Sequence, residues 1–205
     1  MAKLLGVRQQ RVQFFYDTDF LCNGNVGTTS DNLARSQKQL FASASIGDLT
    51  RSNMPSPGYL SGDQTFLTYA VRHEIGFYHG VSGAYSTADV MWLTLHTSTF
   101  RYQVGEKVEF EGPVTMTPAG GGPWGFVSDS AQPILTNGQP ENKAIYVLPL
   151  PIAVAKRQGI RVEELKTSLS SGSAAAIDVV AVINAYDGFR AFRCYIDGFN
   201  TRDVQ

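Results

Sequence analysis

The chain has few cysteines and no long hydrophobic run. Cys22 and Cys194 are the only cysteines among 205 residues, and they lie far apart without C-x-x-C spacing. This spacing excludes a disulfide framework and fits a reducing compartment, although a single bridge between the two stays open. No stretch approaches the roughly 18 apolar residues of a membrane-spanning helix, and residues 1–13 hold no apolar segment like that of a signal peptide. We therefore expect the protein to be made and folded in a cytoplasm.

Charge is also scarce. Charged residues make up 17% of the chain, below the roughly 25% that is usual for soluble domains, and the formal net charge is -1. The near-neutral balance, with only Lys3, Arg8 and Arg11 at the amino-terminal end, gives no basic arm for nucleic acid and no affinity for an anionic membrane surface. We expect no sequence-specific nucleic-acid partner. Low charge suits flanks that are hidden against neighbours, but it equally suits a β-rich domain with a Ser-, Thr- and Asn-rich surface.

Motifs for catalysis are missing as well. The chain has no G-x-S-x-G motif, and its glycine run at residues 119–125 lacks the Lys and Ser/Thr of a phosphate-binding loop. The acidic residues that could serve glycoside hydrolysis are Glu106, Glu109, Glu111 and Asp129, and their spacing does not place any two across a cleft. We predict no catalytic residues and no cofactor.

Histidine occurs only three times, as His73, His79 and His96. A metal site in an antiparallel barrel needs ligands that converge from one face, usually with two histidines two residues apart. His73 and His79 are six residues apart, so we predict no metal site. His73 is predicted to be a hydrogen-bonded core residue, and His96 a surface residue.

The strongest positive signal is the segment Asp63–Gly80, DQTFLTYAVRHEIGFYHG, which is rich in strand-forming residues. Because side chains alternate along a strand, its two faces differ in character. The other face, with Thr68, Arg72, Glu74 and Tyr78, is predicted to be exposed to solvent or to pair its polar side chains. The predicted core face comprises Leu67, Tyr69, Val71, His73, Ile75 and Phe77.

Several weaker patterns surround this strand. We predict strands over residues 89–102, 107–111 and 144–148, with a hairpin turn at residues 104–106. Short helices are predicted from Ser30 or Asp31 to Phe41, from Pro149 and Pro151 to Gly159, and over residues 161–169. A closing hairpin is predicted over residues 177–199, with its turn at residues 186–189.

These elements predict an all-β fold, a single jelly-roll β-barrel or sandwich with an N-terminal arm and one or two short helices. Residues 1–62 would form the arm, with a short helix and an extended connection, and residues 63–205 the barrel. Asp63–Gly80 would then be the first barrel strand.

The segment GYLSGDQTFLTYAVRHEIGF after a helical arm, together with Gly/Pro-rich loops such as Thr115–Asn137, resembles the capsid proteins of tailless icosahedral bacterial viruses. The resemblance covers most of the chain as a pattern and includes no short diagnostic motif. It implies a major shell subunit located in the virion, which self-associates into trimeric or larger capsomers. Other capsid proteins, an internal membrane or the genome would be further partners.

This resemblance implies that the chain makes contacts for assembly and does not turn over a substrate. The aromatic cluster near the amino terminus needs burial, either on its own barrel, which is the preferred interpretation, or on a neighbour. Outside the barrel core, the candidate subunit-interface residues are Phe14, Phe15, Tyr16, Met54, Tyr59, Leu60 and Trp124.

Three alternatives stay open at the level of sequence. One is a vertex or spike protein of a virion, and another is a carbohydrate-binding jelly-roll module that stacks a sugar on Trp124. The third, a cupin-like metalloenzyme, is disfavoured by the histidine spacing.

Overall fold

The computed structural model describes ten stretches of the chain: residues 8–22, 37–41, 48–60, 62, 64–79, 94–119, 124–126, 134–136, 144–166 and 188–203. Ten β-strands and one short 3-10 helix, η1 (Val114–Met116), lie in these stretches, together with a helical turn at residues 94–97. No helix in the described residues is long and apolar enough to span a bilayer.

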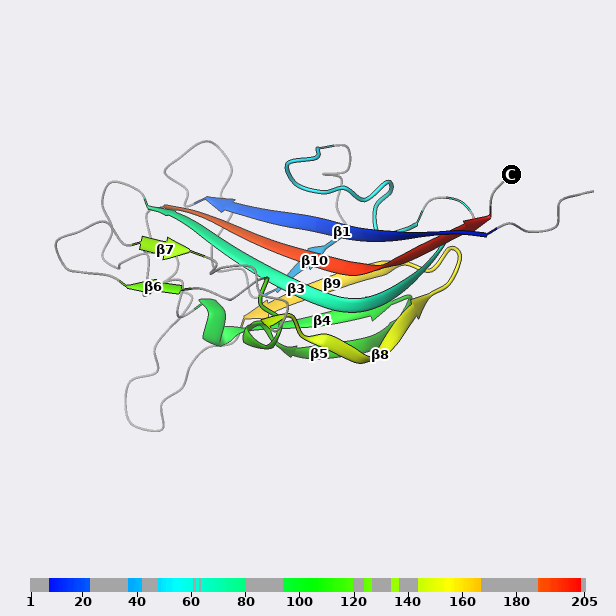
Figure 1. Ribbon diagram of the computed structural model, residues 1–205. Coiled ribbons are helices and arrows are strands. Elements are labelled where there is room, and N and C mark those ends of the chain that lie inside the picture. The colour runs from blue at the N-terminus through cyan, green and yellow to red at the C-terminus, as the bar shows by residue number, and fades with distance from the viewer. Residues whose placement is uncertain are drawn as a thin grey trace, which may run out of the picture.

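Two four-stranded antiparallel sheets face each other (Figure 1). The first sheet has the order β1 (Arg8–Cys22), β10 (Gly188–Asp203), β3 (Thr65–His79) and β8 (Val147–Val154). The second has the order β2 (Gln37–Leu40), β9 (Ile160–Lys166), β4 (Ser98–Val104) and β5 (Lys107–Pro113). A separate two-stranded ribbon joins β6 (Trp124–Phe126) to β7 (Ile134–Thr136).

The strand order is that of a jelly roll. Without the β6–β7 ribbon, eight strands remain, and all but one of their successive connections cross from one sheet to the other. The exception is the β4–β5 hairpin, whose turn is formed by Gly105 and Glu106. Eight antiparallel strands wound in this way over two sheets define the jelly-roll sandwich. The predicted all-β jelly-roll class is confirmed.

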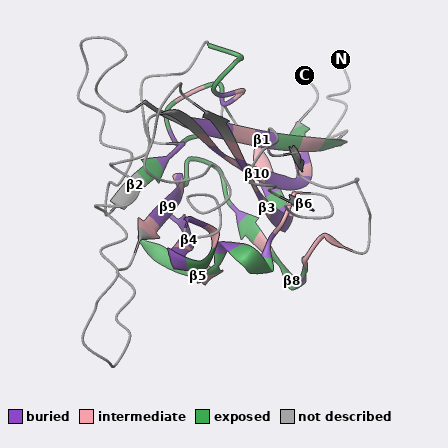
Figure 2. Ribbon diagram, turned by 90° about the vertical axis from the view of Figure 1, so that its left-hand side faces the viewer, coloured by how far each residue is buried: buried purple, intermediate pink, exposed green. Residues whose placement is uncertain are grey.

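The core lies between the two sheets, where buried residues line both inner faces (Figure 2). Aromatic rings fill much of it: Phe15 of β1 packs against Phe66 of β3, with ring centroids 5.0 Å apart. The buried Tyr102 hydroxyl lies 2.8 Å from Thr68 Oγ1, so a polar atom at the centre of the core has a partner. Each sheet thereby contributes aromatic rings to one shared interior.

Strand β3 changes face halfway along its length. Its register with β10 shifts at Asp197/Gly198, which leaves Tyr69 as an extra residue, and its pairing with β8 shifts between Thr68 and Ala70. Such a β-bulge inverts the alternation beyond it. The buried residues are therefore Phe66, Thr68 and Ala70 before the bulge, and Val71, His73 and Ile75 after it. The predicted core face is correct for the second set but wrong for Leu67 and Tyr69, which point outward, while the side chain of Phe77 lies outside the described part.

Three other expectations need correction. Strands β1 and β2 lie in the range predicted as arm, so Asp63–Gly80 contains the third strand of the sandwich and not the first. Residues 37–40, predicted as the end of a helix, pair with β9. Strand β8 continues through Pro149 and Pro151 to Val154, where a helix was expected. Tertiary pairing overrides weak local propensity in each case.

The helix predicted over residues 161–169 is also wrong, because β9 occupies Ile160–Lys166. Val162 and Glu164 are both buried in β9, and the carboxylate of Glu164 hides the apolar alternation that would have identified a strand. The last predicted strand is confirmed as β10, whereas residues 177–187, with the first half of the predicted closing hairpin, lie outside the described residues.

The bulge requires glycine at position 198. A Cβ atom there would lie 2.4 Å from the Leu67 carbonyl oxygen and 2.4 Å from a ring carbon of Phe66. We expect Gly198→Ala to lower the free energy of unfolding by roughly 2–4 kcal/mol, because backbone or a core ring must move. Denaturant unfolding measures this loss.

Gly76→Ala is the matched control on the neighbouring strand. Its Cβ would meet only the Ala191 Cβ, at 3.8 Å, and alanine suits a strand interior better than glycine does. Equal stability of the two variants would contradict the steric requirement for glycine at position 198.

Candidate interaction surface

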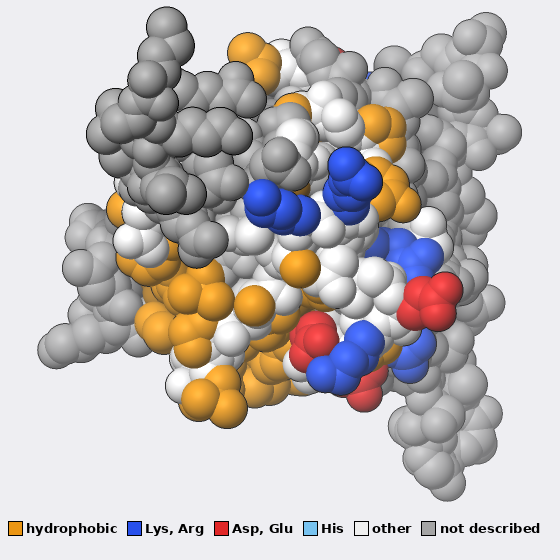
Figure 3. All heavy atoms as spheres, turned by 90° about the vertical axis from the view of Figure 1, so that its right-hand side faces the viewer, with side chains coloured by type: hydrophobic (Ala, Val, Ile, Leu, Met, Phe, Trp, Pro, Cys, Tyr) orange, Lys and Arg blue, Asp and Glu red, His pale blue; other side chains and the backbone are white. Residues whose placement is uncertain are grey.

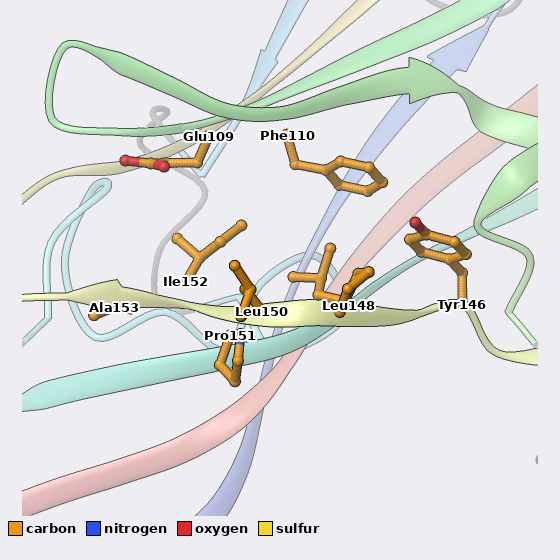
Figure 4. Close-up of a pocket in the computed structure, with 9 residues that line it drawn as sticks. Glu109, Phe110, Tyr146, Leu148, Leu150, Pro151, Ile152 and Ala153 are labelled. Carbon is orange, nitrogen blue, oxygen red and sulfur yellow. The ribbon is translucent and has the colours of Figure 1, made fainter.

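An apolar groove lies where the edge strands of the two sheets, β5 and β8, face each other (Figure 4). Its volume is about 570 Å³. The side chains of Leu148, Leu150 and Ile152 point from β8 toward β5, while Pro151 and Ala153 point away. The lining residues are Glu109, Phe110, Tyr146, Leu148, Pro149, Leu150, Pro151, Ile152 and Ala153.

The two prolines of β8 explain the shape of this wall. Proline has no N–H to donate to a β-ladder, so it is tolerated only at a sheet edge or a bulge. Pairing with β3 runs from Val154 to Ile152 and resumes only at Val147, so the VLPLPI segment bows away from β3. Leu150 is consequently 81% exposed and Val147 58% exposed, although both are aliphatic.

The opposite wall is formed by a second bulge. Tyr102 pairs with Phe110 and Gln103 pairs with Val108, which leaves Glu109 as the extra residue of β5. Such a bulge redirects a side chain, and Glu109 lines the groove. Its carboxylate lies 3.0 Å from the amino group of Lys107, whose side chain is 75% exposed. An ion pair this exposed contributes roughly 0–1 kcal/mol, so Glu109 remains available to another cation.

Two stacked rings close one end of the groove. Phe110 and Tyr146 are parallel to within 7°, with centroids 5.7 Å apart. Phe110 also packs edge-on against Phe100 in the core, with centroids 5.2 Å apart. The aromatic packing at this end of the groove is therefore continuous with the core.

Apolar side chains also cross the outer face of the first sheet. Register places Val12, Phe199, Leu67 and Ala153 in a single row over its four strands. Val12 is 74% exposed and Leu67 is 38% exposed. Figure 3 views the sandwich from the end where the chain's carboxyl terminus lies, and hydrophobic side chains gather at its lower left, on the side of β8. A row of apolar side chains thus runs between the two edges of this sheet.

Beside this row, arginines and tyrosines form a network on the same face. Arg72 makes two hydrogen bonds to Asp197, of 2.5 and 2.9 Å, and lies 4.8 Å from the ring centroid of Tyr195. The Tyr195 hydroxyl donates to Glu74 over 2.7 Å. Burial and that carboxylate raise the pKa of Tyr195, so it stays a neutral donor. Bidentate pairing of this kind fixes the strands around the bulge.

The free edge of β1 is partly covered by the chain itself. The side chain of Asn53 accepts a hydrogen bond from the Tyr16 N–H and donates one to the Phe14 carbonyl, both of 2.8 Å. Ser52 and Asp17 form an isolated bridge next to it. These contacts begin at Phe14, and an edge protected in this way cannot add another strand there.

We expect Asn53→Ala to lower the free energy of unfolding by roughly 1–2 kcal/mol, because it leaves two backbone groups of β1 without these partners. The amide of Tyr16 should also exchange faster with solvent. Leu49→Ala is the control, since Leu49 contributes its backbone oxygen to the Tyr16 hydroxyl and its own side chain is 72% exposed. An equal effect of both variants would argue against edge protection by Asn53.

The structure separates the seven candidate interface residues predicted from the sequence. Phe15, Met54 and Leu60 are buried in the core of their own sandwich, so their side chains offer no surface to a neighbour. Phe14 and Tyr59 are 51% and 54% exposed, whereas Tyr16 is half-buried. Trp124 lies in β6, and its side chain is outside the described part.

Sequence reasoning missed the residues that build the groove. Leu150 and Ile152 lie in a segment predicted to be a helix, and Phe110 and Tyr146 meet only because β5 and β8 are adjacent edges. One signal was present: alternation of proline with aliphatic residues in VLPLPI is typical of an exposed sheet edge.

Two histidines, His73 and His96, have described side chains. His73 is buried, its Nδ1 is 2.7 Å from Thr117 Oγ1, and its ring packs between Phe100 and Phe192. The predicted hydrogen-bonded core histidine is confirmed, and His96 is exposed as predicted. Within the described stretches, no three His, Cys, Asp or Glu residues are grouped as metal ligands would be.

Comparisons of the chain with models of protein families, with curated proteins and with solved structures each found no match.

The buried His73 makes stability depend on pH. Burial lowers its pKa from the ordinary 6.5 to about 3, against the smaller upward effects of Glu164 and the Thr117 backbone. Below pH 6.5 the unfolded chain binds a proton that the folded chain does not. The contribution of His73 to the free energy of unfolding is therefore fully present above this pH. It falls by about 1.4 kcal/mol per pH unit on acidification toward pH 3.

His73→Phe tests this contribution, because it keeps an aromatic ring between Phe100 and Phe192. The free energy of unfolding of the variant should decrease less steeply than that of the parent between pH 6.5 and 5. Parallel curves would show that His73 is not the group responsible.

Proposed function

We propose that the protein is a structural shell subunit that assembles with copies of itself, as in an icosahedral virion. The observation that carries this proposal is the apolar groove at the β5–β8 flank of a jelly-roll sandwich, with Leu150 81% exposed beside it. Clusters of exposed aliphatic side chains on a soluble domain mark interaction sites. A flank is where side-by-side copies of such a sandwich would meet.

Three features support assembly over turnover. Among the described residues, the groove is lined mainly by aliphatic and aromatic side chains, and Glu109 is the one charged residue. The low overall charge reduces the electrostatic cost of packing many copies together. Symmetric shells repeat each contact many times, so each contact can be individually weak. The jelly-roll fold alone would not decide the function, because lectin domains and cupins share it.

The oligomeric state tests the proposal. Purified full-length protein should sediment as a trimer or larger species whose population grows with concentration, well above the 22.4 kDa mass of one chain. Electron microscopy at high concentration should show rings or shells. A monomer that persists at the highest attainable concentration, with no particles in the images, would contradict assembly.

A further inference from the structure

We infer that residues 114–119 form a strap along the edge of β3 and that this strap is released when His73 takes up a proton. The strap comprises η1 and the three residues after it, and it leads from β5 toward β6. The device lies within one copy of the chain, so it is independent of the proposed assembly. Its basis is a set of hydrogen bonds that concentrate on one residue of β3.

Three hydrogen bonds join His73 to the strap. The His73 N–H donates to the Thr117 carbonyl over 2.6 Å, and the Ala119 N–H donates to the His73 carbonyl over 2.8 Å. The third joins Nδ1 of the imidazole to Thr117 Oγ1 over 2.7 Å. Along β3, the pairing with β8 extends no further than Ala70, so the strap occupies the edge beyond β8. The strap is thus attached to β3 at His73.

The side-chain bond also defines which nitrogen of His73 carries the hydrogen. Thr117 Oγ1 lies 3.4 Å from the Val114 carbonyl, which can only accept, so the single hydroxyl proton is used there. Nδ1 then carries the hydrogen that is donated to Thr117 Oγ1, and Nε2 keeps a lone pair. Nε2 is buried and has no hydrogen-bond partner among the described residues. A second proton must therefore bind at Nε2, inside the core.

The rings around the imidazole oppose this second proton. The His73 ring lies between Phe100 of β4 and Phe192 of β10, with centroids 4.5 and 5.4 Å away. An imidazolium in this position loses its hydration and gains no acceptor from the two phenyl rings. Protonation therefore places an unsolvated charge between the sheets.

The titratable groups near His73 do not offset this cost. Cys194 of β10 lies opposite His73 in the register, and burial raises the pKa of its thiol, so it stays neutral. The Glu164 carboxyl of β9 favours the imidazolium, and Lys38 of β2 stands opposite Glu164 in the register. Burial outweighs Glu164 and lowers the pKa of His73 to about 3.

The strap is the part of this environment that can yield without loss of either sheet. β10 pairs with β3 from Thr65 to His79, whereas the strap meets β3 in the isolated bridge between His73 and Pro118. Its release exposes the buried side chains of Val114 and Thr117 and lets water reach the imidazole. Opening one short segment costs less free energy than unfolding the sandwich.

Acid consequently favours release. With the strap attached, His73 takes up a proton only near pH 3, and with the strap released it does so near its ordinary pKa of 6.5. Between these values the released form binds more protons than the attached form. Its population should rise by up to about 10-fold per pH unit on acidification below pH 6.5. The His73 N–H and carbonyl then lie open at the edge of β3, where another extended chain can pair.

Native-state hydrogen exchange of the full-length chain tests this release. Between pH 6.5 and 5, the protection factor of the Ala119 amide should fall by about 3- to 10-fold per pH unit after correction for the intrinsic exchange rate. Low concentrations of denaturant should not change it, because release exposes little surface. Amides of β10, which lies between β1 and β3, are the reference for global unfolding. Exchange of Ala119 only together with β10, with the same denaturant dependence, would overturn the inference.

His73→Asn removes the titrating group and keeps a donor, because the Asn Nδ2 can take the place of Nδ1. The Ala119 protection factor of this variant should be independent of pH over the same range. His96→Asn is the matched control at an exposed histidine, and it should retain the parental pH dependence. A pH dependence that survives in H73N would belong to another group and would overturn the inference.

Thr117→Val tests the attachment with His73 in place, and it decides the question even if H73N does not fold. It removes the hydroxyl that binds Nδ1 and leaves the backbone hydrogen bonds of the strap. The Ala119 protection factor should be about 5-fold or more lower than that of the parent at pH 7 and should still fall below pH 6.5. Parental protection at pH 7 would show that the imidazole does not hold the strap.

Discussion

The pairing of β10 with both β1 and β3 holds the two ends of the chain together. β10 pairs with β1 from Arg8↔Asp203 to Cys22↔Phe189, and with β3 from Thr65↔Thr201 to His79↔Gly188. The last strand is thus inserted between the first and the third, and the first sheet is incomplete until it arrives. Non-local pairing of this kind makes folding slow and cooperative. Both outer edges of this sheet, and so both sites on its flanks, depend on that insertion.

Polar residues inside the sandwich fix its layers relative to each other. Asp17 of β1 accepts hydrogen bonds from the amides of Thr18 and Phe41, and Phe41 follows β2 of the opposite sheet. A buried carboxylate bonded in this way is tolerated because its acceptors are used, and it ties the two layers at one edge. On the other side, between β5 and β8, Phe110 and Tyr146 stack instead. The sandwich is therefore linked by a buried polar group at one flank and by aromatic packing at the other.

The sequence predicts those strands in which apolar and polar residues alternate locally. The turn of the β4–β5 hairpin, β5, β10 and the second half of β3 belong to this group, as does the burial of His73. Of the strand predicted over residues 89–102, residues 98–102 lie in β4, residues 94–97 form a helical turn, and residues 89–93 lie outside the described residues. Local patterns give the wrong prediction for β8 and β9, whose structure depends on strands distant in the sequence. The Glu164 side chain is buried in β9, and the prolines of β8 sit in a strand because that strand is an edge.

The same distinction applies to the candidate surface. Phe14 and Phe15 are adjacent in the sequence, and nothing local indicates that one is exposed and the other buried. Their alternation across β1 decides this, and β1 was expected to be an arm. The groove was harder still to foresee, because Phe110 and Tyr146 are brought together only when two sheets close. Exposed hydrophobic residues can be predicted only once the edge strands are known.

The edges of the first sheet explain why its exposed hydrophobic residues need not lead to indiscriminate strand addition. An open edge pairs with any extended chain, because backbone hydrogen bonds carry no sequence information. Here Asn53 uses the Phe14 and Tyr16 backbone groups on one edge, and Pro149 and Pro151 remove donors from the other. Contacts at these edges must then be made by side chains, whose shape and charge differ from place to place. Such an arrangement converts two aggregation-prone edges into surfaces that can discriminate between partners.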